Sequence, residues 1–155
     1  MLARLHDTHT DPSGFKRVSK DGSTVLHEAA YCRNVSILNS LLASHNPAYT
    51  GFVNDIDHSG NTVLSCMVHA GWRDGIACLV QYMSNGDIDM PNMDGNTPLM
   101  YAAEKNKPEI LSMLLSHNAS IDLYDKNMTS ALAKACYEGS TECVEILLSK
   151  HAALD

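Results

Sequence analysis

The sequence is poor in basic residues, and this shortage limits the partners that the chain can bind. Lys and Arg together number 11, against 18 Asp and Glu, and the formal net charge is −7. Affinity for nucleic acid comes mainly from Lys and Arg side chains that replace counterions around the phosphates. The charge balance therefore disfavours nucleic acid as a partner and gives a slight preference for a basic one.

Closely spaced cysteine pairs are also missing. The number of cysteines is odd, and no two of them form a C-x-x-C pair: Cys32, Cys66, Cys78, Cys136 and Cys143. Neither a disulfide framework nor a cysteine zinc site is indicated, so we expect an intracellular protein, cytoplasmic or nuclear. Three histidines, His45, His117 and His151, lie about one repeat or more apart, and we expect no bound metal.

The chain has no run of about 20 apolar residues and no apolar core of a signal peptide near its start, so we expect no membrane insertion. Signatures of catalysis are absent too: the sequence holds no serine elbow, no catalytic cysteine motif and no phosphate-binding loop. We therefore expect a protein that is not an enzyme and that takes no cofactor and no small-molecule substrate.

What the sequence does contain is an internal repeat. The hydrophobic fraction of 45% suffices for one ordered domain. Four similar segments carry a leucine at the same place, Leu26, Leu64, Leu99 and Leu132, at spacings of 38, 35 and 33 residues. An apolar pair follows each leucine 15 and 16 residues later: Leu41-Leu42, Leu79-Val80, Leu114-Leu115 and Leu147-Leu148. The difference in length therefore falls in the loop after the pair.

Each segment carries the signals of two short helices. A hydroxyl residue that can cap a helix precedes each leucine by two positions: Thr24, Thr62, Thr97 and Ser130. The first helix should end near Arg33, Gly71, Asn106 and Gly139, and a second helix with apolar residues four apart should follow. One helix pair cannot cover its own apolar face, so neighbouring units must stack on each other.

These segments resemble the ankyrin repeat, whose pattern reads roughly D-x-x-G-x-T-P-L-H-x-A-A. Residues 94–103, Asp-Gly-Asn-Thr-Pro-Leu-Met-Tyr-Ala-Ala, match it best. The resemblance implies an all-α solenoid of four helix-turn-helix units with hairpin-like loops between them, as a piece of a longer array. We assign residues 1–18 to an N-terminal flank and 19–56 (with a long loop), 57–91 (divergent), 92–124 and 125–155 to units one to four.

The resemblance also implies a concave groove, formed by the hairpin tips and the exposed faces of the first helices, that binds a partner. Carried over position by position, the expected partner-binding residues are Lys20, Asp21, Ser23, Tyr31, His58, Asn61, His69, Trp72, Met93, Asp94, Asn96, Tyr101, Glu104, Lys105, Lys126, Asn127 and Tyr137. Aromatic side chains are the usual anchors of such a surface. An open alternative for Trp72 and Tyr101 is that they pack against a neighbouring unit.

The function that this resemblance implies is docking of a protein partner or a linear peptide, in the role of a scaffold or adaptor. One alternative is a regulatory or tethering segment of a larger enzyme, channel or receptor. A further alternative, based on length and repeat number alone, is inhibition of a cyclin-dependent kinase.

Overall fold

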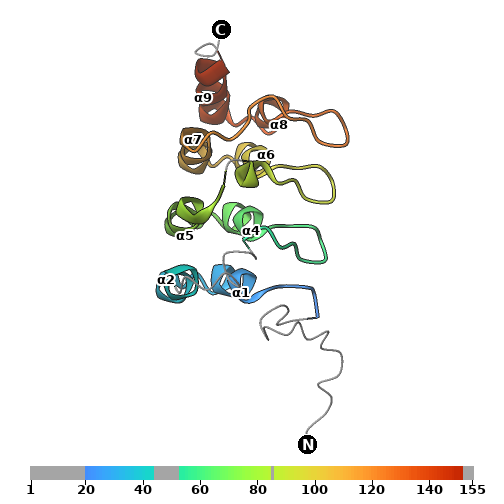
Figure 1. Cartoon of the computed structure of the whole chain (residues 1–155). Coiled ribbons are helices and arrows are strands. Elements are labelled where there is room, and N and C mark those ends of the chain that lie inside the picture. Colours follow the sequence, from blue (N-terminus) through green and yellow to red (C-terminus); the bar gives the residue numbers. More distant parts are fainter. Residues whose placement is uncertain (1–19, 44–52, 85, 152–155) are drawn as a thin grey trace, which may run out of the picture.

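The described part of the chain forms a stack of four helix pairs, as the sequence predicts (Figure 1). The computed structural model describes residues 20–43, 53–84 and 86–151. The pairs are α1 (Val25–Tyr31) with α2 (Val35–Ala43), α4 (Val63–Ala70) with α5 (Arg73–Leu79), α6 (Pro98–Glu104) with α7 (Pro108–Ser116), and α8 (Ala131–Tyr137) with α9 (Thr141–His151). Short 3₁₀ turns, η1 (Val80–Tyr82) and η2 (Asp87–Asp89), lie between α5 and α6. The predicted N-terminal flank and the long loop of unit one fall outside the described residues.

The predicted caps form in all four units. The hydroxyl oxygens of Thr24, Thr62, Thr97 and Ser130 each accept a hydrogen bond from the backbone N–H three residues later. Each first helix is then followed by a residue with positive φ, at Arg33, Gly71, Asn106 and Gly139. A left-handed residue at this place turns the chain and closes the helix. The turn between the two helices is therefore encoded in the same way in each unit.

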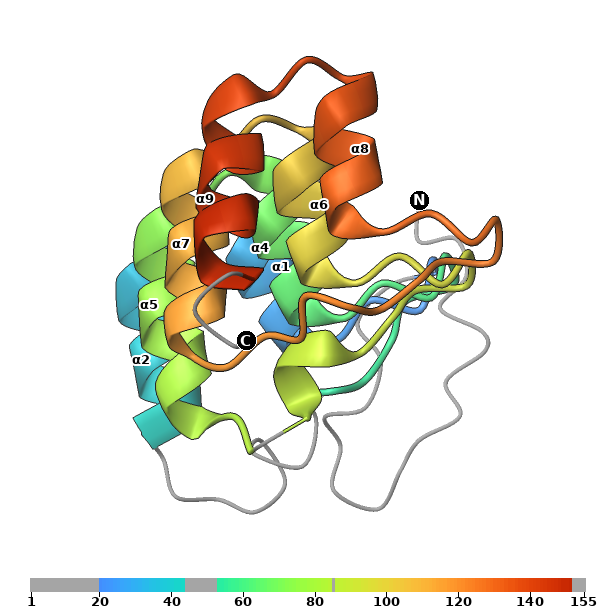
Figure 2. The ribbon, with the colours of Figure 1, turned by 90° about the horizontal axis from the view of Figure 1, so that it is seen from above.

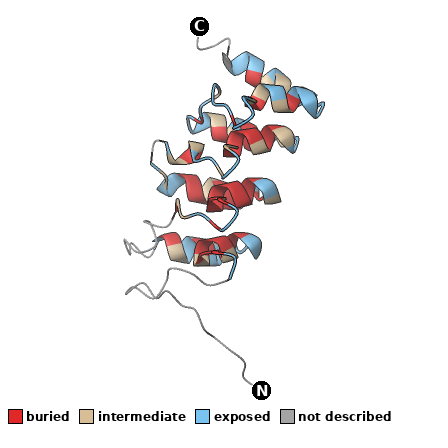
Figure 3. Ribbon diagram, turned by 90° about the vertical axis from the view of Figure 1, so that its right-hand side faces the viewer, coloured by how far each residue is buried: buried red, intermediate tan, exposed pale blue. Residues whose placement is uncertain are grey.

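The helices form two layers that run along the stack (Figure 2). The first helices pack on one another in the order α1, α4, α6 and α8, and the second helices cover them. A continuous apolar core fills the space between the layers, with the repeat leucines Leu26, Leu64 and Leu99 almost fully buried in it. Burial is most extensive in the two middle units (Figure 3). Within the described residues, no helix is long and apolar enough to cross a membrane.

The loops between units are hairpins that extend from one side of the stack (Figure 2). In each of the last three hairpins a carboxylate or amide oxygen accepts hydrogen bonds from two backbone N–H groups, and the residues are Asp57, Asn92 and Asp125. Consecutive hairpins also touch. The N–H of His58 donates to the carbonyl of Asp21 at 2.7 Å, and the N–H of Lys126 donates to that of Asp94 at 3.0 Å.

A glycine stands where each of the first three hairpins approaches the next one. Gly22, Gly60 and Gly95 all have positive φ, and a Cβ on Gly60 would lie 2.5 Å from Cγ of Met93. A Cβ on Gly95 would lie 2.9 Å from the backbone nitrogen of Lys126. The equivalent residue of unit four is Met128, which has φ 59° and is 76% exposed.

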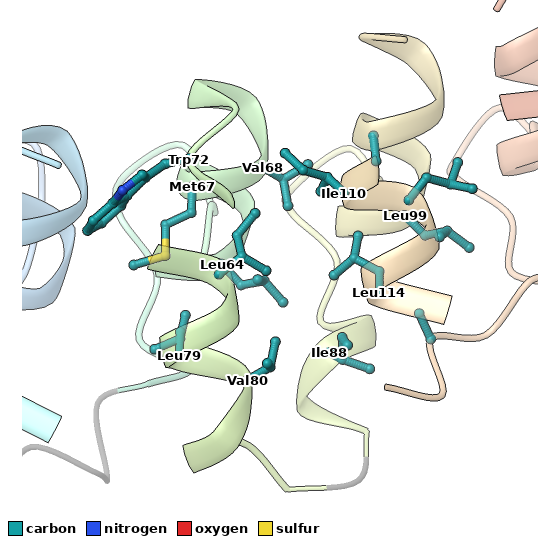
Figure 4. Packing of buried hydrophobic residues seen from close by; sticks show 14 of the residues in the cluster. Leu64, Met67, Val68, Trp72, Leu79, Val80, Ile88, Leu99, Ile110 and Leu114 are labelled. Atoms are coloured by element: carbon teal, nitrogen blue, oxygen red, sulfur yellow. The ribbon is translucent and has the colours of Figure 1, made fainter. Parts of the chain in front are cut away.

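Unit two contains two departures from the repeat that compensate each other. Gly75 occupies the place of Ile110 in unit three, and Trp72 lies one turn earlier, at the start of α5. A Cβ on Gly75 would lie 2.3 Å from Cε3 of Trp72, so the indole ring fills the space that the missing side chain leaves. Trp72 is 6% exposed and packs in the core near Met67 (Figure 4).

We expect Gly75→Ala to destabilise the protein by about 1–3 kcal/mol, because the added methyl group collides with the Trp72 ring, even though alanine favours helix. Urea unfolding of the variant beside Ser36→Ala, an exposed change on α2, measures the difference. Equal stability of the two variants would show that Trp72 can move aside.

The hairpin glycines allow a second comparison between equivalent positions. Gly95→Ala should cost about 1–3 kcal/mol, because it combines positive φ with a collision against the backbone of the next hairpin. Met128→Ala introduces the same side chain at the same position of unit four and should change the free energy of unfolding by less than about 0.5 kcal/mol. Thermal and urea unfolding of both variants test this; a matching loss at both positions would mean that the collision is unimportant.

Candidate partner-binding groove

The groove is the surface formed by the exposed sides of α1, α4, α6 and α8 together with the hairpins. Each first helix contributes two positions to it, one turn apart. The later position holds Tyr31, His69, Glu104 and Tyr137, and the earlier position holds Glu28, Cys66, Tyr101 and Lys134. Residues three apart on a helix lie on the same face, so both positions point to the same surface.

The later position of one unit contacts the earlier position of the next. The hydroxyl of Tyr31 lies 3.7 Å from Sγ of Cys66. The rings of His69 and Tyr101 meet edge to face, with centroids 6.2 Å apart and planes at 81°. Glu104 Oε2 lies 3.6 Å from Nζ of Lys134. These three contacts form a row along the groove, which we call the cross-unit row.

A pocket of about 370 Å³ opens between the first two contacts of the cross-unit row. Its aromatic walls are Tyr31, His69 and Tyr101, from three different units. The rest of its lining consists of small or polar residues and one lysine: Asn61, Ser65, Cys66, Ala70 and Lys105. The pocket therefore exists only because consecutive first helices are stacked.

The two tyrosine hydroxyls and the cysteine thiol of this pocket remain protonated at neutral pH. Burial, reinforced by the contact with Cys66, raises the pKa of Tyr31 to about 12. Burial likewise raises the pKa of the Cys66 thiol to about 11, and the carboxylates of Asp57 and Asp21 act in the same direction. The pKa of Tyr101 is raised by burial and by the nearby Glu104 and Asp94. Carboxylates of the hairpins and of α6 thus lie near enough to these groups to raise their pKa values.

A network of charged side chains follows the pocket toward unit four. Lys105 Nζ lies 2.8 Å from Glu104 Oε1, and hydrogen bonding to Lys105 holds the pKa of Glu104 below its usual range. Lys134 Nζ also lies 3.1 Å from Asp125 Oδ2. The N–H of Thr129 and the Lys134 ammonium hold the pKa of Asp125 below its usual range. The hairpin and the first helix of unit four are joined in this way.

The structure divides the predicted partner-binding residues into four groups, of which the fourth, Trp72 and Ser23, is buried. Five of them line the pocket: Tyr31, Asn61, His69, Tyr101 and Lys105. A second group lies exposed on the hairpins, at Lys20, Asp21, His58, Met93, Asp94, Lys126 and Asn127, with Asn96 half-buried beside them. Glu104 and Tyr137 hold the later groove position of α6 and α8, outside the pocket, and Tyr137 is 90% exposed.

Two of the predicted residues are placed where a partner cannot reach them. Trp72 fills the core beside Gly75, so it has a packing role. The contact with Gly75 lies within its own unit, whereas the alternative expected packing against a neighbouring unit. Ser23 is fully buried at the start of α1, where its N–H donates to Oδ1 of Asp21. The hairpin pattern placed Ser23 correctly along the chain, but its side chain is buried.

Sequence reasoning missed Ser65 and Cys66 as lining of the pocket. The repeat register contained a signal for Cys66, because it occupies the same place in unit two as Tyr101 in unit three. The signal for Ser65 was the position that holds the histidine of the ankyrin pattern, which is His27 in unit one. His27 Nε2 donates to the carbonyl of Asn61 at 3.1 Å, while its Nδ1 accepts from the N–H of Thr24. Ser65 replaces this histidine in unit two and faces the pocket instead.

We expect that the free energy of unfolding of Asp125→Asn falls less steeply than that of the wild type when the pH is lowered into the acid range. The folded pKa of Asp125 lies below its unfolded value of about 3.9, so its contribution is complete above that pH and is lost as the pH falls through the folded pKa. The hairpin should survive, because Asn92 accepts the equivalent two N–H bonds in unit three. Urea midpoints from pH 7 downwards measure the change.

Glu145→Gln, an exposed change on α9, removes the same charge without touching the hairpin and serves as the control. If the urea midpoints of both variants fall with decreasing pH as steeply as those of the wild type, Asp125 does not contribute to the loss of stability in acid.

Comparisons with known proteins agree with this geometry. A family model described as ankyrin repeats (three copies) matches residues 26–125 and 67–155. The B-cell lymphoma 3 protein homolog of Mus musculus is 30% identical over 139 residues, which cover 87% of this chain and 30% of that protein. The "Putative palmitoyltransferase ZDHHC13" of Danio rerio is 41% identical over 71 residues, or 44% of this chain and 11% of that protein.

A third relative is the transient receptor potential cation channel subfamily A member 1 of Homo sapiens, 25% identical over 138 residues, or 88% of this chain and 12% of the channel. The chain thus spans less than a third of the length of these relatives. The hairpins, the capped helix pairs and the family match lead to one conclusion: the chain belongs to the ankyrin-repeat family.

Proposed function

We propose that this chain docks a protein partner or a linear peptide in its groove and acts as a scaffold or adaptor. Ankyrin repeats are a general protein-interaction module. The observation that supports a groove partner here is the exposure of aromatic side chains at the later groove position of α1 and α8, with Tyr31 52% and Tyr137 90% exposed. Rigid aromatic side chains on a concave surface are typical anchors of binding energy.

We further propose that the chain has no catalytic centre of its own. The raised pKa values of Cys66 and Tyr31 support this, because a thiol and a phenol that stay protonated at neutral pH are weak nucleophiles. Among the described residues, no group of three or more His, Cys, Asp or Glu side chains could hold a metal ion. The five free cysteines support an intracellular location.

A second role, as a regulatory or tethering segment of a larger enzyme, channel or receptor, is favoured by one observation. Two of the relatives named above are a palmitoyltransferase and a cation channel by description, and the matching segment makes up 11% and 12% of their lengths. A binding groove is compatible with either role, since tethering also requires a bound partner.

Capture from cell lysate tests the groove. The wild-type chain and a variant with Tyr31, His69 and Tyr137 changed to alanine serve as baits, and mass spectrometry quantifies the retained proteins. We expect at least one partner to be reduced about thirtyfold or more on the variant, since an aromatic anchor contributes about 2 kcal/mol or more.

The matched control changes Ser36, Glu109 and Glu145 to alanine, three exposed residues of the second helices. Circular dichroism must show the same melting temperature for all baits. Partners that bind the groove variant as well as the wild type, or that are lost on the control variant, would place the binding surface outside the groove.

A further inference from the structure

The pocket between Tyr31, His69 and Tyr101 has the size and the walls for one large side chain of a partner. Its volume of about 370 Å³ lies at the lower end of the range for ligand sites. Three aromatic rings from α1, α4 and α6 border it, and two of them already stand edge to face. Aromatic faces attract flat or cationic groups as well as apolar ones.

The charges around the pocket favour a cationic group. Asp21 and Asp57 act on the Cys66 thiol from the first two hairpins, and Asp94 and Glu104 act on the Tyr101 phenol. Glu104 is held by Lys105 and Lys134, so we call the other three carboxylates, those of Asp21, Asp57 and Asp94, the acidic rim. With other described residues, neither Asp57 nor Asp94 forms an ion pair.

The lysine in the pocket wall does not cancel this charge. Lys105 Nζ is held at 2.8 Å by Glu104 Oε1, while the other oxygen of Glu104 faces Lys134. The lysine is therefore already paired with a carboxylate next to it in the sequence. The acidic rim would repel an acidic group of a partner and attract a cationic one.

Arginine fits these walls better than lysine does. A guanidinium group is planar, stacks on aromatic faces and carries only donors, so it needs acceptors around it. Asn61 lines the pocket and supplies one: its amide nitrogen donates to Asp57 Oδ2 at 3.3 Å, so its amide oxygen is the acceptor. The hydroxyl oxygen of Tyr31 is a further acceptor, whereas that of Tyr101 already accepts from the amide nitrogen of Asn92 at 2.7 Å.

We propose that this pocket binds an arginine side chain of a basic linear peptide, stacked between aromatic rings and surrounded by the acidic rim. The proposal rests on the proposed function, because it names the chemistry of the group that the groove takes. The net charge of −7 for the whole chain acts in the same direction over longer distances.

The first experiment is a selection of random linear displayed peptides on the wild-type chain, with each binder retested on the Tyr31/His69/Tyr137 alanine variant. We expect the groove-dependent binders to share an arginine. Groove-dependent binders that carry no basic residue would overturn the arginine pocket and leave the groove function standing. If no binder depends on the groove, the proposed function fails too.

The second experiment replaces that arginine in a selected peptide with citrulline, lysine, norleucine or glutamate, and isothermal titration measures the affinities. Citrulline keeps the shape and removes the charge. We expect it to bind about tenfold more weakly than arginine, a typical value for a desolvated cation on aromatic rings. Equal binding of arginine, citrulline and norleucine would contradict the proposal.

We expect two changes in the protein to alter the affinity for the arginine peptide in opposite directions. Lys105→Gln removes the lysine of the wall and should tighten the arginine peptide, whereas Asp94→Asn removes an exposed carboxylate of the acidic rim and should weaken it. Glu145→Gln on α9 is the control and should leave the affinity unchanged. Weaker binding to Lys105→Gln would show that the pocket prefers an anionic group, and the proposal would be wrong.

Discussion

The structure depends on the backbone contact between consecutive hairpins. Where the N–H of His58 meets the carbonyl of Asp21, and that of Lys126 meets the carbonyl of Asp94, the distance between units is fixed by a hydrogen bond. A side chain at the crossing point would force the units apart, so glycine is required there. Because helix pairs of this size are not stable alone, the contact also determines how much apolar surface each unit buries against the next.

The groove follows from this spacing. When units stack at a fixed distance, the later groove position of one first helix comes beside the earlier groove position of the next first helix. The same two positions then produce a thiol contact at Tyr31, an aromatic contact at His69 and an ion pair at Glu104. The fold supplies the geometry, and the choice of side chains at two positions per unit supplies the chemistry of the surface.

Much of the fold could be read from the sequence because its determinants are local. The caps at Thr24, Thr62, Thr97 and Ser130 and the left-handed turns at Gly71, Asn106 and Gly139 involve neighbours within a few residues. The pairing of Trp72 with Gly75 is not evident from the repeat pattern, because the tryptophan that fills the space lies one turn before the glycine that leaves it. The pocket could not be foreseen either, because its walls are 35 residues apart in the chain, as in the contact of Tyr31 with Cys66.

Met128 has a consequence for how this array could change by duplication or exchange of its units. Units one to three present a glycine to the neighbour that stacks on them, and each could be copied and inserted beside a similar unit without a collision at the hairpin. Unit four presents a Cβ and a long side chain at that place, already in the left-handed conformation. A copy of unit four placed inside the array would need a glycine at position 128 first, so the order of the units is not freely interchangeable.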